Sequence, residues 1–156
     1  MGFWERLIGS DPASSKDARS LVSDLVLNCI EEQGLAQQLR EHAERAPHHA
    51  GADQLRAVAE QQDQVVQLLQ DALTARDETA GVEPKPVKGG QNHWARVGHD
   101  LADNRALMKR YGELVAYWDP EVPDAVALFQ SLERSKSQIG AALRDIGLRA
   151  DPHALD

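Results

Sequence analysis

The chain has 156 residues, the length of one ordinary domain, and at that size no disulfide or metal is needed to hold a core. Hydrophobic residues make up 42% of it and aromatic residues only 4%, a composition typical of packed helices and not of a sheet. The formal charge of -8, from 25 acidic and 17 basic residues, offers no strong cationic footprint for phosphates, so we expect no nucleic-acid partner.

A short amphipathic segment, Phe3–Ile8, opens the chain and is set apart by Gly9-Ser10-Asp11-Pro12. We expect residues 1–12 to be an appendage and residues 16–150 to form one domain. Three interpretations of the segment stay open: a turn of helix folded onto the domain, a membrane-surface anchor, or a docking peptide. Its single Arg and single Glu disfavour the membrane, because interfacial anchors use a basic face. The chain lacks an apolar run of about 20 residues and a signal-peptide start, so we expect a cytoplasmic protein.

Two apolar stripes at helical spacing follow. The first predicts a helix from about Lys16 to Ala46 and the second a helix ending near Glu78, with the break at Pro47–Gly51 closing an antiparallel hairpin. The inward positions of the first stripe are Leu21, Leu25, Asn28, Glu32, Leu35, Leu39 and His42. Those of the second are Leu55, Val58, Gln62, Val65, Leu69 and Leu73.

Residues 80–90 hold two Pro and three Gly and cannot continue a helix. Extended, they span about 35 Å, close to the roughly 40 Å of a helix of about 28 residues. We therefore expect a long connection that runs along the bundle between the second and third helices, and not a tight turn.

A second hairpin completes the pattern. Its first stripe comprises Trp94, Val97, Leu101, Asn104, Met108, Tyr111, Val115 and Trp118, and Asp119–Pro123 ends it. Its second stripe comprises Phe129, Leu132, Lys136, Ile139, Leu143 and Ile146. Asp24-Leu25 and Asn28 of the first hairpin are matched by Asp100-Leu101 and Asn104 of the second, which indicates a weak internal repeat. The fold class that we predict is an all-α antiparallel four-helix bundle.

The run Ala36–Pro47, AQQLREHAERAP, followed by Leu55–Glu60, LRAVAE, resembles the first hairpin of rubrerythrin-type members of the ferritin-like superfamily. Residues 142–146 and 151–153 resemble the second half of such proteins. The likeness covers about residues 20–150. It implies a ferritin-like bundle in which two helices each give one Glu and the other two each give Glu-x-x-His to a pair of irons.

The resemblance places the Glu and His of one such motif at Gln62 and Val65, and those of the other at Lys136 and Ile139. Both imidazoles are thus replaced by aliphatic side chains, and a Lys at the centre would oppose two irons. We therefore predict that the metal ligands are lost, that there is no metal or other cofactor, and that a buried polar network stands in their place. Its members are Asn28, Glu32, Gln62, Asn104 and Lys136, with Lys136 paired to Glu32.

Cys29, His42 and a set of aromatic residues also invite a functional interpretation. Cys29 lies in an apolar stripe and is expected to be a small buried hydrophobe. His42, near the end of the first helix, is expected to be partly buried beside the helix dipole and not a metal ligand. Trp94, Tyr111 and Trp118 are expected to fill the core, whereas Tyr117 lies off the stripe, where a dimer face would use it.

These patterns favour a non-catalytic structural or protein-interaction module, with an unidentified protein partner or self-association. Two alternatives remain. One is a di-iron oxidase or ferroxidase with a non-standard site made of Glu32, Glu60 and His42. The other is a membrane-surface adaptor that acts through Phe3–Ile8.

Overall fold

The computed structural model describes residues 12–156. The opening segment Phe3–Ile8 lies outside this range. The described residues form four helices and no strand: α2 (Pro12–Glu44), α3 (His49–Thr74), α4 (His93–Trp118) and α5 (Pro123–Arg149). In this part of the chain, none of the helices combines the length and the apolar character that crossing a bilayer requires.

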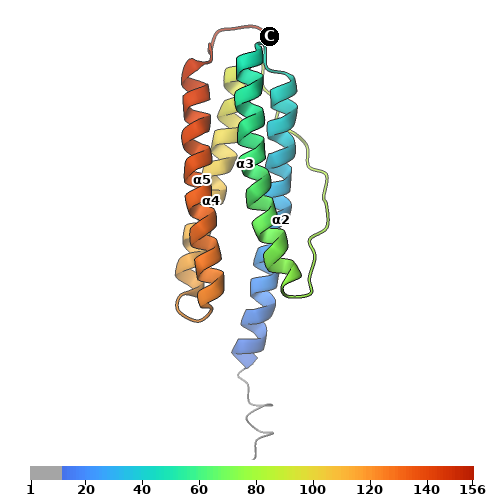
Figure 1. Cartoon of the computed structure of the whole chain (residues 1–156), viewed down its shortest axis with the longest axis vertical. Coiled ribbons are helices and arrows are strands. Elements are labelled where there is room, and N and C mark those ends of the chain that lie inside the picture. Colours follow the sequence, from blue (N-terminus) through green and yellow to red (C-terminus); the bar gives the residue numbers. More distant parts are fainter. Residues whose placement is uncertain (1–11) are drawn as a thin grey trace, which may run out of the picture.

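The four helices form two antiparallel hairpins that pack into a bundle, as Figure 1 shows. Helix α2 packs on α3 and α4 packs on α5, while α2 also contacts α4 and α3 contacts α5. The pairs α2–α5 and α3–α4 therefore face each other across the diagonals. Residues 75–92 run back along the side of the bundle, so that α4 begins at the same end as α3 (Figure 1). The predicted fold class and its long connection are confirmed.

Local chemistry accounts for the helix ends. Pro123 occupies the first turn of α5, where its missing N–H is not needed. The Asn92 side chain caps α4 by accepting a hydrogen bond from the Ala95 N–H at 2.8 Å.

Two predicted helix limits were wrong. Helix α2 already begins at Pro12, and α3 ends at Thr74, after which Asp77 takes a φ of 55° in a turn that closes on the Leu73 carbonyl.

Three of the four predicted stripes are confirmed in full, because every inward position predicted for α2, α3 and α5 is buried. The stripe of α4 was partly wrong. Trp94 is 48% exposed, whereas Tyr111 and Trp118 are 0% exposed as predicted. Trp94 stands in the first turn of α4, beside the last turn of α5, and lines an open groove there instead of the core. The interior line of α4 runs instead through Val97, Asp100, Asn104, Leu107, Tyr111 and Trp118.

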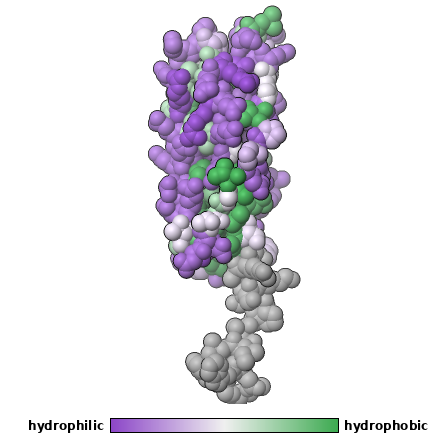
Figure 2. Space-filling view, turned by 90° about the vertical axis from the view of Figure 1, so that its right-hand side faces the viewer, coloured by the Kyte–Doolittle hydropathy of each residue, from purple (hydrophilic) through white to green (hydrophobic). Residues whose placement is uncertain are grey.

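The face that carries residues 75–92 is mostly hydrophilic, and its hydrophobic side chains gather in separate patches (Figure 2).

Residues 75–92, which we call the crossover, are held at their end by close packing. A Cβ atom on Gly90 would lie 2.9 Å from the backbone nitrogen of Arg96 and 3.0 Å from the Ala95 Cβ. Only glycine therefore fits where the crossover meets the first turn of α4.

We expect Gly90→Ala to destabilise the protein by about 1–3 kcal/mol, because backbone atoms of α4 cannot move aside as a flexible side chain would. That loss lowers the melting temperature by roughly 3 °C per kcal/mol. Gly89→Ala is the matched control, since a Cβ there meets nothing within 4 Å. Thermal unfolding followed by circular dichroism measures both. Equal melting temperatures for the two variants would contradict this account of the crossover.

Candidate functional site

Four polar side chains, one from each helix, meet in the middle of the bundle. They are Glu32 of α2, Gln62 of α3, Tyr111 of α4 and Lys136 of α5, and each is 0% exposed. We call them the central cluster. Lys136 Nζ donates to Glu32 Oε2 at 2.7 Å and to Gln62 Oε1 at 2.8 Å. The ammonium group is therefore held by a carboxylate and an amide from two other helices.

The remaining polar atoms of the cluster are also paired. Tyr111 donates its hydroxyl proton to Glu32 Oε1 at 2.7 Å. The Gln62 amide donates both to Glu32 Oε2 and, at 3.0 Å, to the Glu32 carbonyl oxygen. Both carboxylate oxygens of Glu32 are thus engaged by donors from the protein itself. Tyr111 is held from the side by stacking on Phe129, with 6.1 Å between the ring centres.

Burial sets the electrostatics of this cluster. Burial lowers the pKa of Lys136, and the Glu32 carboxylate opposes that shift by favouring the ammonium form. Burial likewise raises the pKa of Tyr111 well above its usual value, and the charge of Glu32 adds to this shift. The Cys29 thiol, one turn from Glu32, has a pKa raised by burial and by the same carboxylate. Cys29 is 0% exposed, as expected for a buried hydrophobe.

The two asparagines of the predicted network have other hydrogen bonds. Asn104 Nδ2 donates to the backbone oxygen of Lys136 at 2.9 Å, so Asn104 supports the cluster from its edge. Asn28 donates to the Asp24 backbone oxygen at 2.7 Å and accepts a longer bond from Arg110 at 3.3 Å. The structure thus brings Glu32, Gln62 and Lys136 together and places Asn28 apart from them. Sequence reasoning assigned Tyr111 to the core but missed its hydroxyl contact.

A second buried network lies nearer the start of α4. His42 is 0% exposed, which corrects the expectation of partial burial. Its Nδ1 lies 2.8 and 2.9 Å from the two carboxylate oxygens of Asp100, and its Nε2 lies 2.7 Å from the Lys88 carbonyl oxygen. Gln38 donates to Asp100 at 2.8 Å and accepts from the Lys88 N–H at 3.0 Å. This network, which we call the crossover network, fixes the crossover to α2 and α4.

The repeated aspartates of the two hairpins have reciprocal partners. Asp100 on α4 binds His42 near the end of α2, and Asp24 on α2 accepts a hydrogen bond at 3.2 Å from Trp118 at the end of α4. The spacing from Asp24 to His42 along α2 equals the spacing from Asp100 to Trp118 along α4. Burial raises the pKa of Asp24, against the effects of the Trp118 bond and of Arg110. The repeated aspartates therefore lie at the interface between α2 and α4, which we call the α2–α4 seam.

The alternative metal site is not assembled in the described part of the chain. Glu60 is exposed on α3, whereas Glu32 is buried in the central cluster and His42 in the crossover network. Among the side chains that the structure describes, those of residues 21–156, there is no group of three or more His, Cys, Asp or Glu arranged to hold a metal ion. Sequence reasoning missed Asp100 and Gln38 as partners of His42.

No protein-family model matches this sequence, and none of the curated proteins does. Among solved structures the chain is similar to a dodecameric thioferritin, the bacterioferritin-related protein from Bacteroides fragilis. The two chains are 14% identical, the match covers 82% of this chain and 84% of that chain, and the TM-score is 0.73. At this identity the likeness establishes the fold alone: a four-helix bundle like that of the thioferritin.

The pairing of Lys136 with Glu32 gives a direct prediction. We expect Lys136→Met or Glu32→Gln alone to destabilise the protein by about 3–5 kcal/mol, because each leaves a buried charge without its partner. The double variant should recover most of this loss. Urea denaturation of the four proteins gives the coupling energy.

Lys109→Met is the control, because the Lys109–Glu113 pair is 3.8 Å apart and its side chains are 80% and 66% exposed. We expect it to change stability by less than about 0.5 kcal/mol. If the two single losses simply added in the double variant, the pair would not act as a unit.

Proposed function

We propose that this protein is a non-catalytic ferritin-like bundle that serves as a structural or protein-interaction module. The observation that carries the proposal is the Lys136 ammonium group, bonded to Glu32 at 2.7 Å and to Gln62 at 2.8 Å in the middle of the bundle. In ferritin-like di-metal proteins, carboxylates and imidazoles from the four helices converge inside the bundle. Here the protein's own cation fills the space between the helices and neutralises the one carboxylate present.

The donor set of the central cluster does not fit a pair of iron ions. It offers one carboxylate, one amide, one phenol and one ammonium group, whereas two hard dications need several carboxylates to balance their charge. The positions where the rubrerythrin-type likeness implies imidazoles hold Val65 and Ile139, each 1% exposed. Our proposal therefore includes that this chain is of rubrerythrin-type origin and has lost the metal ligands.

The interaction half of the proposal is supported by exposed aromatic side chains. Tyr117 is 63% exposed and packs edge-on against Trp118, with 4.9 Å between the ring centres. Trp94, at the opposite end of α4, is also partly exposed. Aromatic residues of this kind are enriched in protein interfaces. The similar thioferritin is described as dodecameric, and we propose self-association for this chain as well.

Metal content tests the first half of the proposal. Protein expressed with added iron and purified without a His-tag should contain less than about 0.1 metal ion per chain, since the centre offers too few ligands. Elemental analysis measures this directly. The comparison variant is Gln62→Glu/Lys136→Glu, which removes the cation and adds two carboxylates facing Glu32, and it should bind more metal than the natural chain. Close to two irons per natural chain would favour the oxidase alternative instead.

Sedimentation tests the second half. We expect the natural chain to sediment as an oligomer at micromolar concentrations, and Tyr117→Glu to dissociate it, because burying a carboxylate in an apolar contact is costly. Trp94→Glu, at the other end of α4, identifies the contacting face: only the variant that lies within the contact should dissociate. A natural chain that stays monomeric at about 100 µM would contradict self-association, because even weak specific association is measurable at that concentration.

A further inference from the structure

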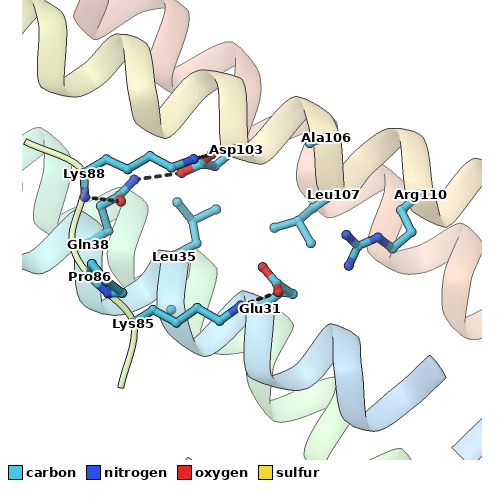
Figure 3. Close-up of a pocket in the computed structure, with 11 residues that line it drawn as sticks. Glu31, Leu35, Gln38, Lys85, Pro86, Lys88, Asp103, Ala106, Leu107 and Arg110 are labelled. Carbon is cyan, nitrogen blue, oxygen red and sulfur yellow. Dashed lines mark hydrogen bonds and ion pairs between the residues drawn. The ribbon is translucent and has the colours of Figure 1, made fainter. Parts of the chain in front are cut away.

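The crossover covers a hollow between α2 and α4, shown in Figure 3, with a volume of about 150 Å³. We call it the seam pocket. Leu35 of α2 and Leu107 of α4 form an apolar surface inside it. The stem of Lys85 closes one side, because a Cβ on Gly34 would lie only 3.2 Å from the Lys85 Cδ. The pocket is distinct from the central cluster, although Leu35 and Leu107 lie one turn from Glu32 and Tyr111 respectively.

Two ion pairs form the walls of the pocket. Lys85 of the crossover is paired with Glu31 of α2, and Lys88 of the crossover is paired with Asp103 of α4. These pairs are visible in Figure 3 as links from the crossover to each helix. Each lysine is therefore neutralised by a carboxylate that also lines the pocket.

Arg110 is the remaining charged group in the pocket. It forms no ion pair with another residue that lines the pocket, and the carboxyl group on which its charge acts, that of Asp24, lies outside the pocket. Its guanidinium group points toward the hollow in Figure 3. Among the described residues its hydrogen bond is the long one to Asn28, at 3.3 Å, and it forms no ion pair with a carboxylate there. The lining residues thus carry one positive charge in excess. A half-buried guanidinium with free donors beside an apolar surface is suited to bind a carboxylate.

We propose that the seam pocket binds a small monocarboxylate. Its carboxylate group accepts hydrogen bonds from Arg110, and its short hydrocarbon chain lies on Leu35 and Leu107. A volume of about 150 Å³ has room for a molecule the size of benzene, which sets the ligand at about six non-hydrogen atoms. One negative charge balances the pocket, and the apolar surface favours a fatty acid of short chain over inorganic phosphate. This binding does not depend on the metal content of the bundle.

Butyrate is the probe that fits this size. Titration of isotope-labelled full-length protein, followed by amide chemical shifts, should show saturable binding at one site with a dissociation constant on the order of 1 mM. The shifts should centre on Gly34 and Leu107. 1-Butanol and butylamine, which have the same chain but no negative charge, should bind at least about tenfold more weakly, which corresponds to about 1.4 kcal/mol.

Arg110→Gln should weaken butyrate binding at least about tenfold, and Arg110→Lys, which keeps the charge but not the paired donors, should give an intermediate affinity. Arg105→Gln is the matched control, because Arg105 is exposed on the same helix and does not line the pocket. It should leave binding unchanged within about twofold.

Three outcomes would overturn the proposal: no saturable shift with butyrate, equal binding of 1-butanol, or undiminished binding by folded Arg110→Gln protein. Tighter binding of inorganic phosphate than of butyrate would also overturn it, because the apolar surface would then have no part in recognition.

Discussion

The buried ammonium group of Lys136 constrains the arrangement of this bundle. Lys136 is 0% exposed, and an ammonium group without water is tolerated only when it is paired with a carboxylate and its other donors are bonded. Glu32 supplies the charge and Gln62 supplies a second acceptor. Helices α2 and α5 do not pack directly on each other, so the Glu32–Lys136 pair crosses the diagonal of the bundle. It therefore ties the two hairpins at one height, and Gln62 and Tyr111 link the other two helices to the same point.

The crossover network fixes the hairpins at a second height. The two ring nitrogens of His42 both face oxygen atoms, Nε2 that of the Lys88 carbonyl and Nδ1 those of the Asp100 carboxylate. Gln38 joins the same carboxylate to the crossover backbone. The long connection is thus held by side chains from both hairpins. Two polar layers, one central and one nearer the crossover's end, give the α2–α4 seam a single register that a uniform apolar seam would not specify.

Periodicity was sufficient for most of the fold. Stripes at a spacing of three and four gave the inward faces of α2, α3 and α5, including the polar positions Glu32, Gln62 and Lys136. It failed on α4, where an apolar residue at the right spacing, Trp94, lies at the helix start and is partly exposed, while the charged Asp100 is buried. A carboxylate is ordinarily assigned to the surface, and only a partner reverses that assignment. His42 on an apolar stripe was the available signal that such a partner exists.

The contacts within the site were beyond what a stripe can indicate. A stripe places a residue on a face, but the height at which two helices meet decides whether Asn28 or Tyr111 reaches Glu32. Asn28 lies one turn before Glu32 on α2 and donates to the backbone of its own helix. Tyr111 on α4 lies opposite the Glu32 carboxylate. The same heights separate the central cluster from the seam pocket, since Leu35 and Leu107 stand between them. On our proposals, the ion pair in the centre of the bundle leaves no charge there for a ligand. Arg110, which forms no ion pair among the described residues, provides that charge in the seam pocket instead.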